Sequence, residues 1–291
     1  MTQAAMPLRN LARHNGLRAM GRLPGPVEYG RELWAHRHFV TAFAGARVTA
    51  SLGGTRLGAA WELLTPLINA GIYFLIFGVV LGARHSTPHF VAYLCIGVFV
   101  FGFTQSVVQA GVRAISGNLG LVRALNFPRA ALPVGITLTE ARNMVVSAAV
   151  LVAIVLAGGV PAGPGWLLLA PAILLQSVFN AGLALLVARL GAQLEDLRRL
   201  TPFVLRIWMY GSAVLYPVTF LTDHLHGRLR HLAEANPMLV FIDLTRHTLL
   251  PGVPLVAPAW RLWTEATAWA LLVGAAGYAY FRRGESEYGR G

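Results

Sequence analysis

The stretch that decides the fold is residues 90–112, with the sequence FVAYLCIGVFVFGFTQSVVQAGV. It contains no charged residue, and it is longer than the roughly 20 residues that a helix needs to cross a membrane's hydrocarbon core. Within that core every backbone polar group must be paired inside the protein, which restricts spanning segments to helices and closed barrels. The stretch is therefore predicted to be a transmembrane helix.

Five further apolar stretches flank this one. The chain is 56% hydrophobic and only 12% charged, whereas soluble domains are about a quarter charged. These features predict an all-α membrane protein with six transmembrane helices. The five other spans are expected at residues 63–81, 131–160 (uncharged from 143), 165–188, 207–222 and 262–281.

The basic residues predict the orientation. All 24 are arginines; with the N-terminus inside, 17 fall in cytoplasmic segments and four in outer segments. Such an excess is typical of cytoplasmic loops, so both termini are predicted to be cytoplasmic. Since this topology explains the net charge of +12, no nucleic-acid partner is expected. Without any lysine, the chain has no P-loop lysine, so ATP would have to bind a separate subunit.

Three segments are not expected to span. Residues 1–27 are predicted to be a flexible cytoplasmic tail, which leaves 28–288 as one membrane domain. Residues 29–48 suit an amphipathic helix lying at the inner membrane surface, with apolar and arginine side chains on different faces. Residues 223–259 are predicted to form re-entrant or interfacial helices before the last span, because Asn236-Pro237 offers a cap and a first-turn proline.

Five motifs, in order, resemble those of the ABC-2 type permease family, and within it the exporters of O-antigen, teichoic acid or galactan. One departure is Gly211-Ser212-Ala213, which replaces the first proline of the family's Pro-Val-Ile-Tyr-Pro. The resemblance implies a homodimer, two copies of a separate ATPase that binds ATP and Mg, and a channel between the two protomers. The motifs are SLGGTRLGAAWELLTP (51–66), NLGLVRALNFPRAALP (118–133), the loop 193–202 with Glu195-Asp196-Leu197-Arg198, VLYP (214–217) and Asn236-Pro237.

The loop around residues 117–133 carries apolar side chains that should not face water without a partner. The resemblance implies that this loop is a coupling helix seated in a groove of the ATPase. The alternative is a simple connection between spans. The residues predicted to dock are Asn118, Leu121, Arg123, Leu125, Phe127, Pro128 and Arg129.

Two further sets of residues are predicted from the resemblance. An N-terminal gate helix would admit a lipid pyrophosphate head, with Trp34, Arg47 and Arg56 placed to meet it. Aromatic side chains in the first and fifth spans are expected to line the channel, where flat rings can pack on sugar C–H faces; lipid-facing packing is the alternative. These aromatic residues are Tyr73, Phe74, Phe77, Trp208, Tyr210 and Tyr216.

Several polar residues have simpler interpretations. Glu140 and Arg206 either form a pair between spans or extend toward the cytoplasmic surface. Asp243 and Arg246, three apart on a short helix, are expected to brace each other. Cys95 is expected to be a buried apolar residue. No metal site is predicted, since the cluster His224, His226, His231 and His247 lacks the supporting pattern that ligands need.

The expected function is therefore export of a lipid-linked polysaccharide from the cytoplasmic to the outer leaflet of the cell membrane. The lysine-free, Ala- and Gly-rich composition favours a GC-rich genome and a cell-wall polymer such as a galactan. The alternatives are an exporter of drugs or small lipids, a membrane-embedded glycosyltransferase and a scaffold subunit. A transferase would need acidic catalytic motifs on its loops, and the only adjacent acidic pair is Glu195-Asp196.

Overall fold

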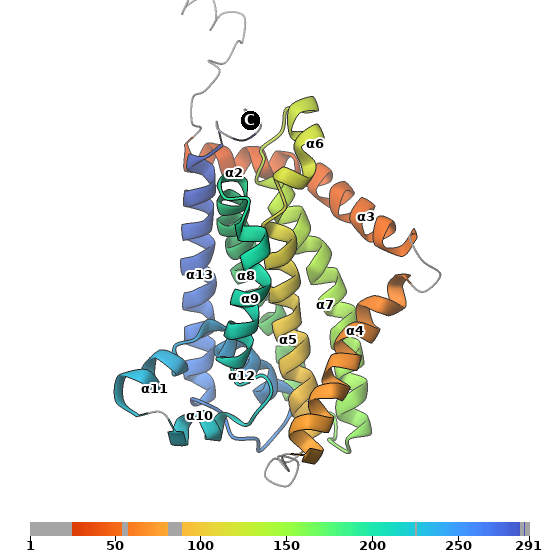
Figure 1. Ribbon diagram of the computed structural model, residues 1–291, viewed down its shortest axis with the longest axis vertical. Helices are drawn as coiled ribbons and strands as arrows, with labels where there is room; N and C mark the ends of the chain where they lie inside the picture. Colours follow the sequence, from red (N-terminus) through yellow and green to blue (C-terminus); the bar gives the residue numbers. More distant parts are fainter. Residues whose placement is uncertain (1–24, 54–57, 81–88, 225, 286–287, 289–291) are drawn as a thin grey trace, which may run out of the picture.

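A computed structural model describes residues 25–53, 58–80, 89–224, 226–285 and 288. In this part of the chain all regular structure is helical, as predicted. The longer helical segments run roughly along the long axis of the molecule in Figure 1. They are α4 (Gly58–Tyr73) continued by η1 (Phe74–Val80), α5 (Phe90–Gly111), α7 (Ala131–Ala157), α8 (Leu169–Gln193), α9 (Leu197–Tyr210) and α13 (Ala259–Arg283).

Among the described residues, three helices are long and apolar enough to cross a membrane: Phe90–Gly111, Ala131–Ala157 and Pro164–Gln193. The last begins with the short helix η4 (Pro164–Leu168) and continues as α8. A shorter apolar helix covers Leu67–Val80. The chain is thus a multi-pass helical membrane protein, while the count of six spans stays a prediction.

The helix at the place of the predicted fifth span begins and ends elsewhere than expected. A span was expected at residues 207–222, but α9 covers Leu197–Tyr210 and includes Pro202. The prediction was wrong because it placed the span where the sequence has no charged residue. The helix α9 is instead amphipathic and carries arginines along one side. Beyond Gly211 the chain turns, with Ala213 at φ 46°. Tyr216 consequently lies in this turn and not on α9.

The N-terminal amphipathic segment forms two helices, α2 (Pro26–Ala35) and α3 (Arg37–Gly53), separated at His36. Figure 1 shows both lying across the same end of the molecule as the short helix α6 (Leu119–Ala124). Tyr29, Val40 and Ala44 are buried against the long helices. The expected amphipathic pattern is therefore present, on two helices instead of one.

Glycines bring α8 and α13 together along a line that we call the glycine seam. A Cβ atom added to Gly277 would lie 2.1 Å from the backbone oxygen of Gly182, and one added to Gly182 would lie 2.4 Å from the oxygen of Val273. Only glycine fits at such distances, and small residues of this kind let membrane helices pack backbone against backbone. The seam fixes the two helices against each other.

The opposite end of the molecule holds three short helices, α10 (Val218–His224), α11 (Gly227–Glu234) and α12 (Pro237–Leu249). The side chain of Asn236 accepts a hydrogen bond from Met238 N at 3.1 Å, which confirms the predicted cap. The predicted brace is also confirmed, with Arg246 Nη1 3.1 Å from Asp243 Oδ1 and both side chains fully buried. Whether these helices re-enter a membrane stays a prediction.

The Asp243–Arg246 pair fastens several segments to one another. Arg246 Nη2 donates to the carbonyl oxygen of Ala213 at 3.0 Å, and its guanidinium lies 3.4 Å from the ring centroid of Tyr93 on α5. The other oxygen of Asp243 accepts from Val256 N at 2.8 Å. A single buried pair thus holds α12, α5, the turn after α9 and the segment before α13.

Candidate functional site

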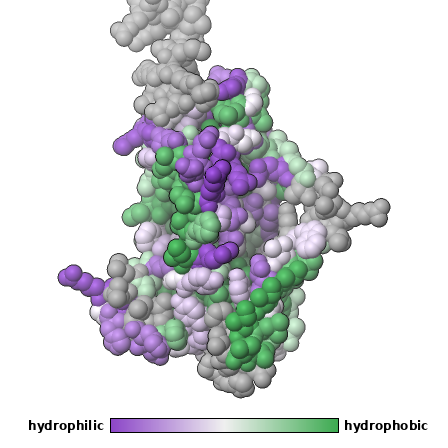
Figure 2. Space-filling model, viewed as in Figure 1, coloured by the Kyte–Doolittle hydropathy of each residue, from purple (hydrophilic) through white to green (hydrophobic). Residues whose placement is uncertain are grey.

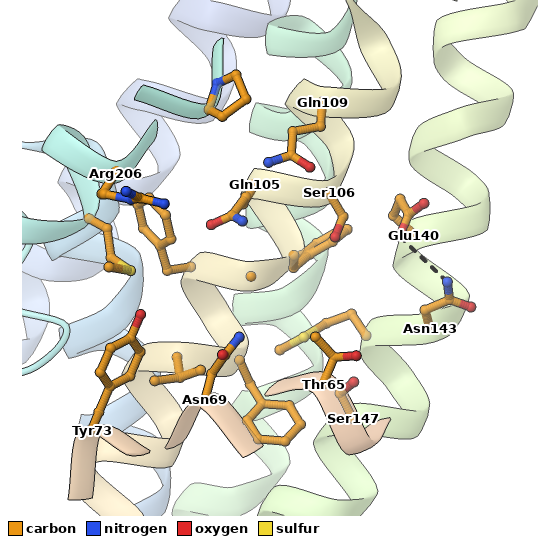
Figure 3. A pocket seen from close by; sticks show the side chains of 18 of the residues that line it. Thr65, Asn69, Tyr73, Gln105, Ser106, Gln109, Glu140, Asn143, Ser147 and Arg206 are labelled. Carbon is orange, nitrogen blue, oxygen red and sulfur yellow. Dashed lines mark hydrogen bonds between the residues drawn. The ribbon is translucent and has the colours of Figure 1, made fainter. Parts of the chain in front are cut away.

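A cleft of about 680 Å³ opens between α4, α5, α7 and α9, and we call it the central cleft. Figure 3 shows polar side chains pointing into it from all of these helices. In Figure 2 the face around it is hydrophilic in the middle, beside a hydrophobic area over α4 and η1. That area includes the exposed side chains of Ile68, Ile72, Leu75, Ile76, Val79 and Val80.

The polar lining follows from helical spacing. Residues three or four apart share one face of a helix, and lining side chains recur at these intervals, most of them polar, on the α4, α5 and α7 walls of the cleft. A wet surface within apolar helices is what a hydrophilic substrate would need. The lining residues at these intervals are Trp61, Thr65, Asn69 and Tyr73 on α4, Gln105, Ser106 and Gln109 on α5, and Glu140, Asn143 and Ser147 on α7.

Sequence reasoning missed most of this lining, because it searched the spans for aromatic and charged residues and did not follow amide and hydroxyl side chains. The signal was present: residues 61, 65, 69 and 73 are spaced four apart. Of the aromatic residues predicted to line a channel, Tyr73 does line the central cleft. Trp61, which was not predicted, lines it too.

The other predicted channel aromatics with a described side chain do not line the central cleft. Phe74 packs near Phe90, with ring centroids 6.3 Å apart. Trp208 donates a hydrogen bond to the capping side chain of Asn236 at 2.9 Å. The hydroxyl of Tyr216 donates to the carbonyl oxygen of Tyr210 at 2.7 Å, and Tyr210 is half exposed. The side chain of Phe77 lies outside the described part of the chain.

Two ionisable side chains reach the central cleft from opposite walls. Arg206 extends from α9 and Glu140 from α7, with Gln105 and Ser106 between them in Figure 3. Asn143 donates to Glu140 at 3.4 Å. The proposed contact between Glu140 and Arg206 is thus replaced by an arrangement in which both groups face the same polar space.

The predicted coupling loop divides into an exposed and a buried part. Leu125 is 51% exposed and Leu119 37% exposed, and Arg123 is also exposed, while Leu121 and Asn118 are half-buried. Phe127, in contrast, is buried with its ring centroid 4.5 Å from that of Phe39. Pro128 is buried as well, so these two residues support the loop from within and do not face outward.

Through Glu285, Arg129 connects this loop to the residues after α13 and to Tyr29 on α2. Its backbone N–H donates to Glu285 at 2.9 Å, and its guanidinium lies 3.5 Å from the same carboxylate. The hydroxyl of Tyr29 donates to Glu285 at 2.6 Å. Burial raises the pKa of the Glu285 carboxyl, although the hydrogen bonds from Arg129 and Tyr29 oppose that change. Burial also raises the pKa of Tyr29, as does the charge of Glu285.

The three predicted gate residues differ in their surroundings. Trp34 on α2 is 71% exposed. Arg47 on α3 lines a second, smaller cleft next to the central one. Arg56 lies outside the described residues. The predicted docking of a lipid head on these residues stays a prediction.

Metal ligands were also sought among the described side chains. No group of three or more His, Cys, Asp or Glu there could hold a metal ion. His224 hydrogen-bonds through Nδ1 with the carbonyl oxygen of Phe220 in its own helix at 2.8 Å. Cys95 is buried and free, as predicted, and burial suits a small apolar residue in the core.

Comparison with known proteins identifies the family. The model of the ABC-2 type transporter family matches residues 46–250, from α3 to the end of α12. The match includes every wall of the central cleft and the predicted coupling loop. The chain therefore belongs to the ABC-2 type transporter family.

The chain is also similar to individual permeases. The chain is 27% identical over 236 residues to the O-antigen export system permease protein RfbA of Myxococcus xanthus, which covers 79% of this chain and 88% of that protein. It is 23% identical over 197 residues to the protein of the same name from Klebsiella pneumoniae, covering 67% of this chain and 74% of that one. The similarity thus extends over most of the length of these permeases.

Proposed function

We propose that this chain is the membrane permease of an ABC exporter that carries a lipid-linked polysaccharide from the cytoplasmic to the outer leaflet. Two copies of the chain would work with two copies of a separate ATPase that binds ATP and Mg. The observation that carries the proposal is the central cleft, where polar side chains from four helices line an open space inside a bundle of apolar helices. The family and the names of the relatives support a polysaccharide as the cargo.

The cleft suits a glycan on chemical grounds. Its amides and hydroxyls can exchange hydrogen bonds with sugar hydroxyls. Trp61 and Tyr73 add flat rings on the α4 wall, which can pack against sugar C–H faces. A greasy drug would instead favour a largely apolar cavity.

The apolar surfaces beside the cleft suit a second copy of the chain. On α9 the side chains of Phe203, Val204 and Ile207 are each more than half exposed, and they border the same wall as Arg206. In a homodimer, the α4 and α9 walls of two protomers would enclose a channel between them. The ATP-driven closure of the partner would then shift the equilibrium between closed and open arrangements.

The partner ATPase would dock at the end of the molecule that carries α6, which the arginine distribution predicts to be cytoplasmic. Leu119 and Leu125 are the exposed apolar side chains of this segment, and exposed apolar surface next to arginines is typical of an interface. Since Phe127 and Pro128 are buried, we propose that Leu119, Arg123 and Leu125 make the contact.

Co-purification from the native host tests the partner. The tagged chain should retain a stoichiometric ABC-class ATPase in mild detergent, and Leu125→Asp should release it while the permease stays folded. Phe220→Asp is the matched control, because Phe220 is 55% exposed on α10, at the end of the bundle away from α6. A chain that purifies alone, or that keeps its ATPase in Leu125→Asp, would contradict the proposed docking.

Depletion of the chain tests the cargo. If the cargo is a lipid-linked polysaccharide, the glycan-lipid should accumulate on the inner leaflet while the surface polymer falls. Composition analysis of the accumulated glycan would decide whether it is a cell-wall galactan, our specific expectation. Normal surface polymer, with increased sensitivity to a drug, would instead favour the small-molecule exporter.

A further inference from the structure

The smaller cleft beside the central one has an unusual lining. Its volume is about 460 Å³, and three arginines from separate segments reach it: Arg47 from α3, Arg113 from the turn after α5, and Arg198 from α9. No acidic side chain is found among the described residues that line it. We call this the arginine inlet, and its described lining carries three positive charges and no carboxylate.

The described contacts leave these guanidinium groups available. The side chain of Arg47 contacts the ring of Phe43, 5.9 Å from its centroid. Within the described part of the chain, neither Arg113 nor Arg198 makes a side-chain hydrogen bond or ion pair. The Nε atoms of Arg47 and Arg198 are buried without a partner there. Buried donors normally have a partner, so this arrangement favours a bound anion.

The chemistry of the inlet selects a phosphate ester. A guanidinium group matches phosphate oxygens with two parallel donors, and several such groups around one site are typical of phosphate recognition. The hydroxyl of Thr201, also in the lining, already donates to the Leu197 carbonyl oxygen at 2.6 Å. The arginines are therefore the main source of binding, and a neutral sugar would gain little there.

The inlet is continuous with the central cleft. Ser106, Gln109 and Pro202 line both spaces. A ligand whose charged part lies among the arginines could therefore extend its uncharged part along the polar walls of α4, α5 and α7. This arrangement fits a molecule that has a phosphate or diphosphate at one end and a glycan attached to it.

The inlet also touches the segment that leads to the coupling helix. Arg113 and Asn118 both line it, and they begin and end the short turn between α5 and α6. The start of this turn is anchored: a Cβ atom on Gly191 would lie 2.1 Å from the backbone oxygen of Val112. An anion that draws Arg113 and Arg198 together would consequently act on the chain between a fixed point and α6.

We propose that the arginine inlet binds the phosphate or diphosphate ester of a lipid through Arg47, Arg113 and Arg198, and that its occupancy changes the placement of α6 and so stimulates the partner ATPase. The inference rests on the proposed function, because it assigns the charged end of the proposed cargo to a site. Two sources share this chemistry, a prenyl diphosphate head and the phosphate of a bulk phospholipid.

Direct binding tests the site without any export. The full chain in neutral-lipid nanodiscs is titrated with farnesyl diphosphate. The double variant Arg113→Gln/Arg198→Gln should bind at least tenfold more weakly, since each charge-assisted contact is worth about a factor of ten. Arg228→Gln is the control, because Arg228 is exposed on α11 at the opposite end. Equal affinity in wild type and double variant would overturn the site.

A second set of nanodiscs distinguishes the sources. If phosphatidylglycerol competes with farnesyl diphosphate only weakly, the site belongs to a prenyl diphosphate. If phosphatidylglycerol competes fully, and its effect disappears in the double variant, the same site belongs to a bulk phospholipid. Both outcomes support an anion site at the inlet, whereas competition that is unaffected by the double variant contradicts it.

The ATPase of the complete complex tests the link to α6. Farnesyl diphosphate should raise the hydrolysis rate of the wild-type complex and of Arg228→Gln, and the double variant should lose that stimulation. Binding that persists without any stimulation would overturn the proposed link to α6. If farnesyl diphosphate binds and stimulates hydrolysis as expected, but depletion of the chain leaves the surface polymer unchanged, the proposed cargo is wrong while the inlet stands, so the two proposals fail separately.

Discussion

The glycine seam and the central cleft are opposite solutions to packing membrane helices. At the seam, α8 and α13 approach so closely that a Cβ on Gly277 would overlap the backbone of Gly182. Around the cleft, α4, α7 and α9 stand apart and present amides, hydroxyls and charges to an open space. The difference indicates that the seam side is a fixed scaffold, and under the proposed function the walls of the cleft are where the substrate would pass.

The sharpest test of the scaffold is the buried pair Asp243–Arg246, at the end of the bundle away from α6. Asp243→Ala leaves Arg246 fully buried without its carboxylate, and breaking such a pair typically costs about 3–5 kcal/mol of unfolding free energy. Thermal unfolding in detergent should show a large loss. Arg230→Ala removes a partly exposed pair with Glu234 and should cost at most about 1 kcal/mol. Similar losses in both variants would contradict a special role for the buried pair.

Disrupting the glycine seam should cause the next largest loss of stability. In Gly277→Ala the new methyl group overlaps the Gly182 backbone, and overpacking of this kind costs about 1–3 kcal/mol. Gly274→Ala is a matched control on the same helix, because its Cβ would meet Val178 at an ordinary 3.7 Å. Thermal unfolding should separate the two variants. If both melt alike, α8 and α13 can shift apart and the seam is not a fixed element.

Removing the buried carboxyl of Glu285, which Tyr29 and Arg129 contact, should have a smaller, pH-dependent effect on stability. Burial raises the pKa of Glu285 above 4.5 in the folded chain, so its stabilising contribution is complete below that pH and is lost as the pH rises through the folded pKa. Glu285→Gln cannot ionise, and its unfolding temperature relative to wild type should therefore increase with pH. Glu28→Gln, on the exposed surface of α2, is the control. A constant difference between Glu285→Gln and wild type would contradict the burial of an ionisable carboxyl.

The sequence predicted those features that depend on neighbours along the chain. The spans at α5 and α7, the cap at Asn236 and the Asp243–Arg246 brace all follow from composition or helical spacing. The position of α9 did not, because an amphipathic helix beside a polar cleft need not be uncharged. The burial of Phe127 depends on Phe39, far away in the sequence, and no local pattern distinguishes such a residue from one that faces a partner.

The walls of the cleft should show the smallest effect on stability and a clear effect on transport. Asn69→Leu replaces a polar group that lines open space, so the unfolding free energy should change by no more than about 0.5 kcal/mol. Export should fall by up to about fivefold, because a hydrogen bond to the passing glycan is worth about 1 kcal/mol. The measurement is the rate at which polymer appears at the surface, with permease levels matched between strains.

Thr267→Ala is the control for this variant, because Thr267 is exposed on α13, which does not line the central cleft, and it should change neither quantity. If Asn69→Leu destabilises the chain as much as Gly277→Ala does, the cleft is part of the scaffold and the contrast between the two regions fails. If it is stable and exports normally, the polar walls serve some purpose other than passage of the glycan. Reduced export from a stable protein is the one result that assigns transport to the cleft and stability to the seam.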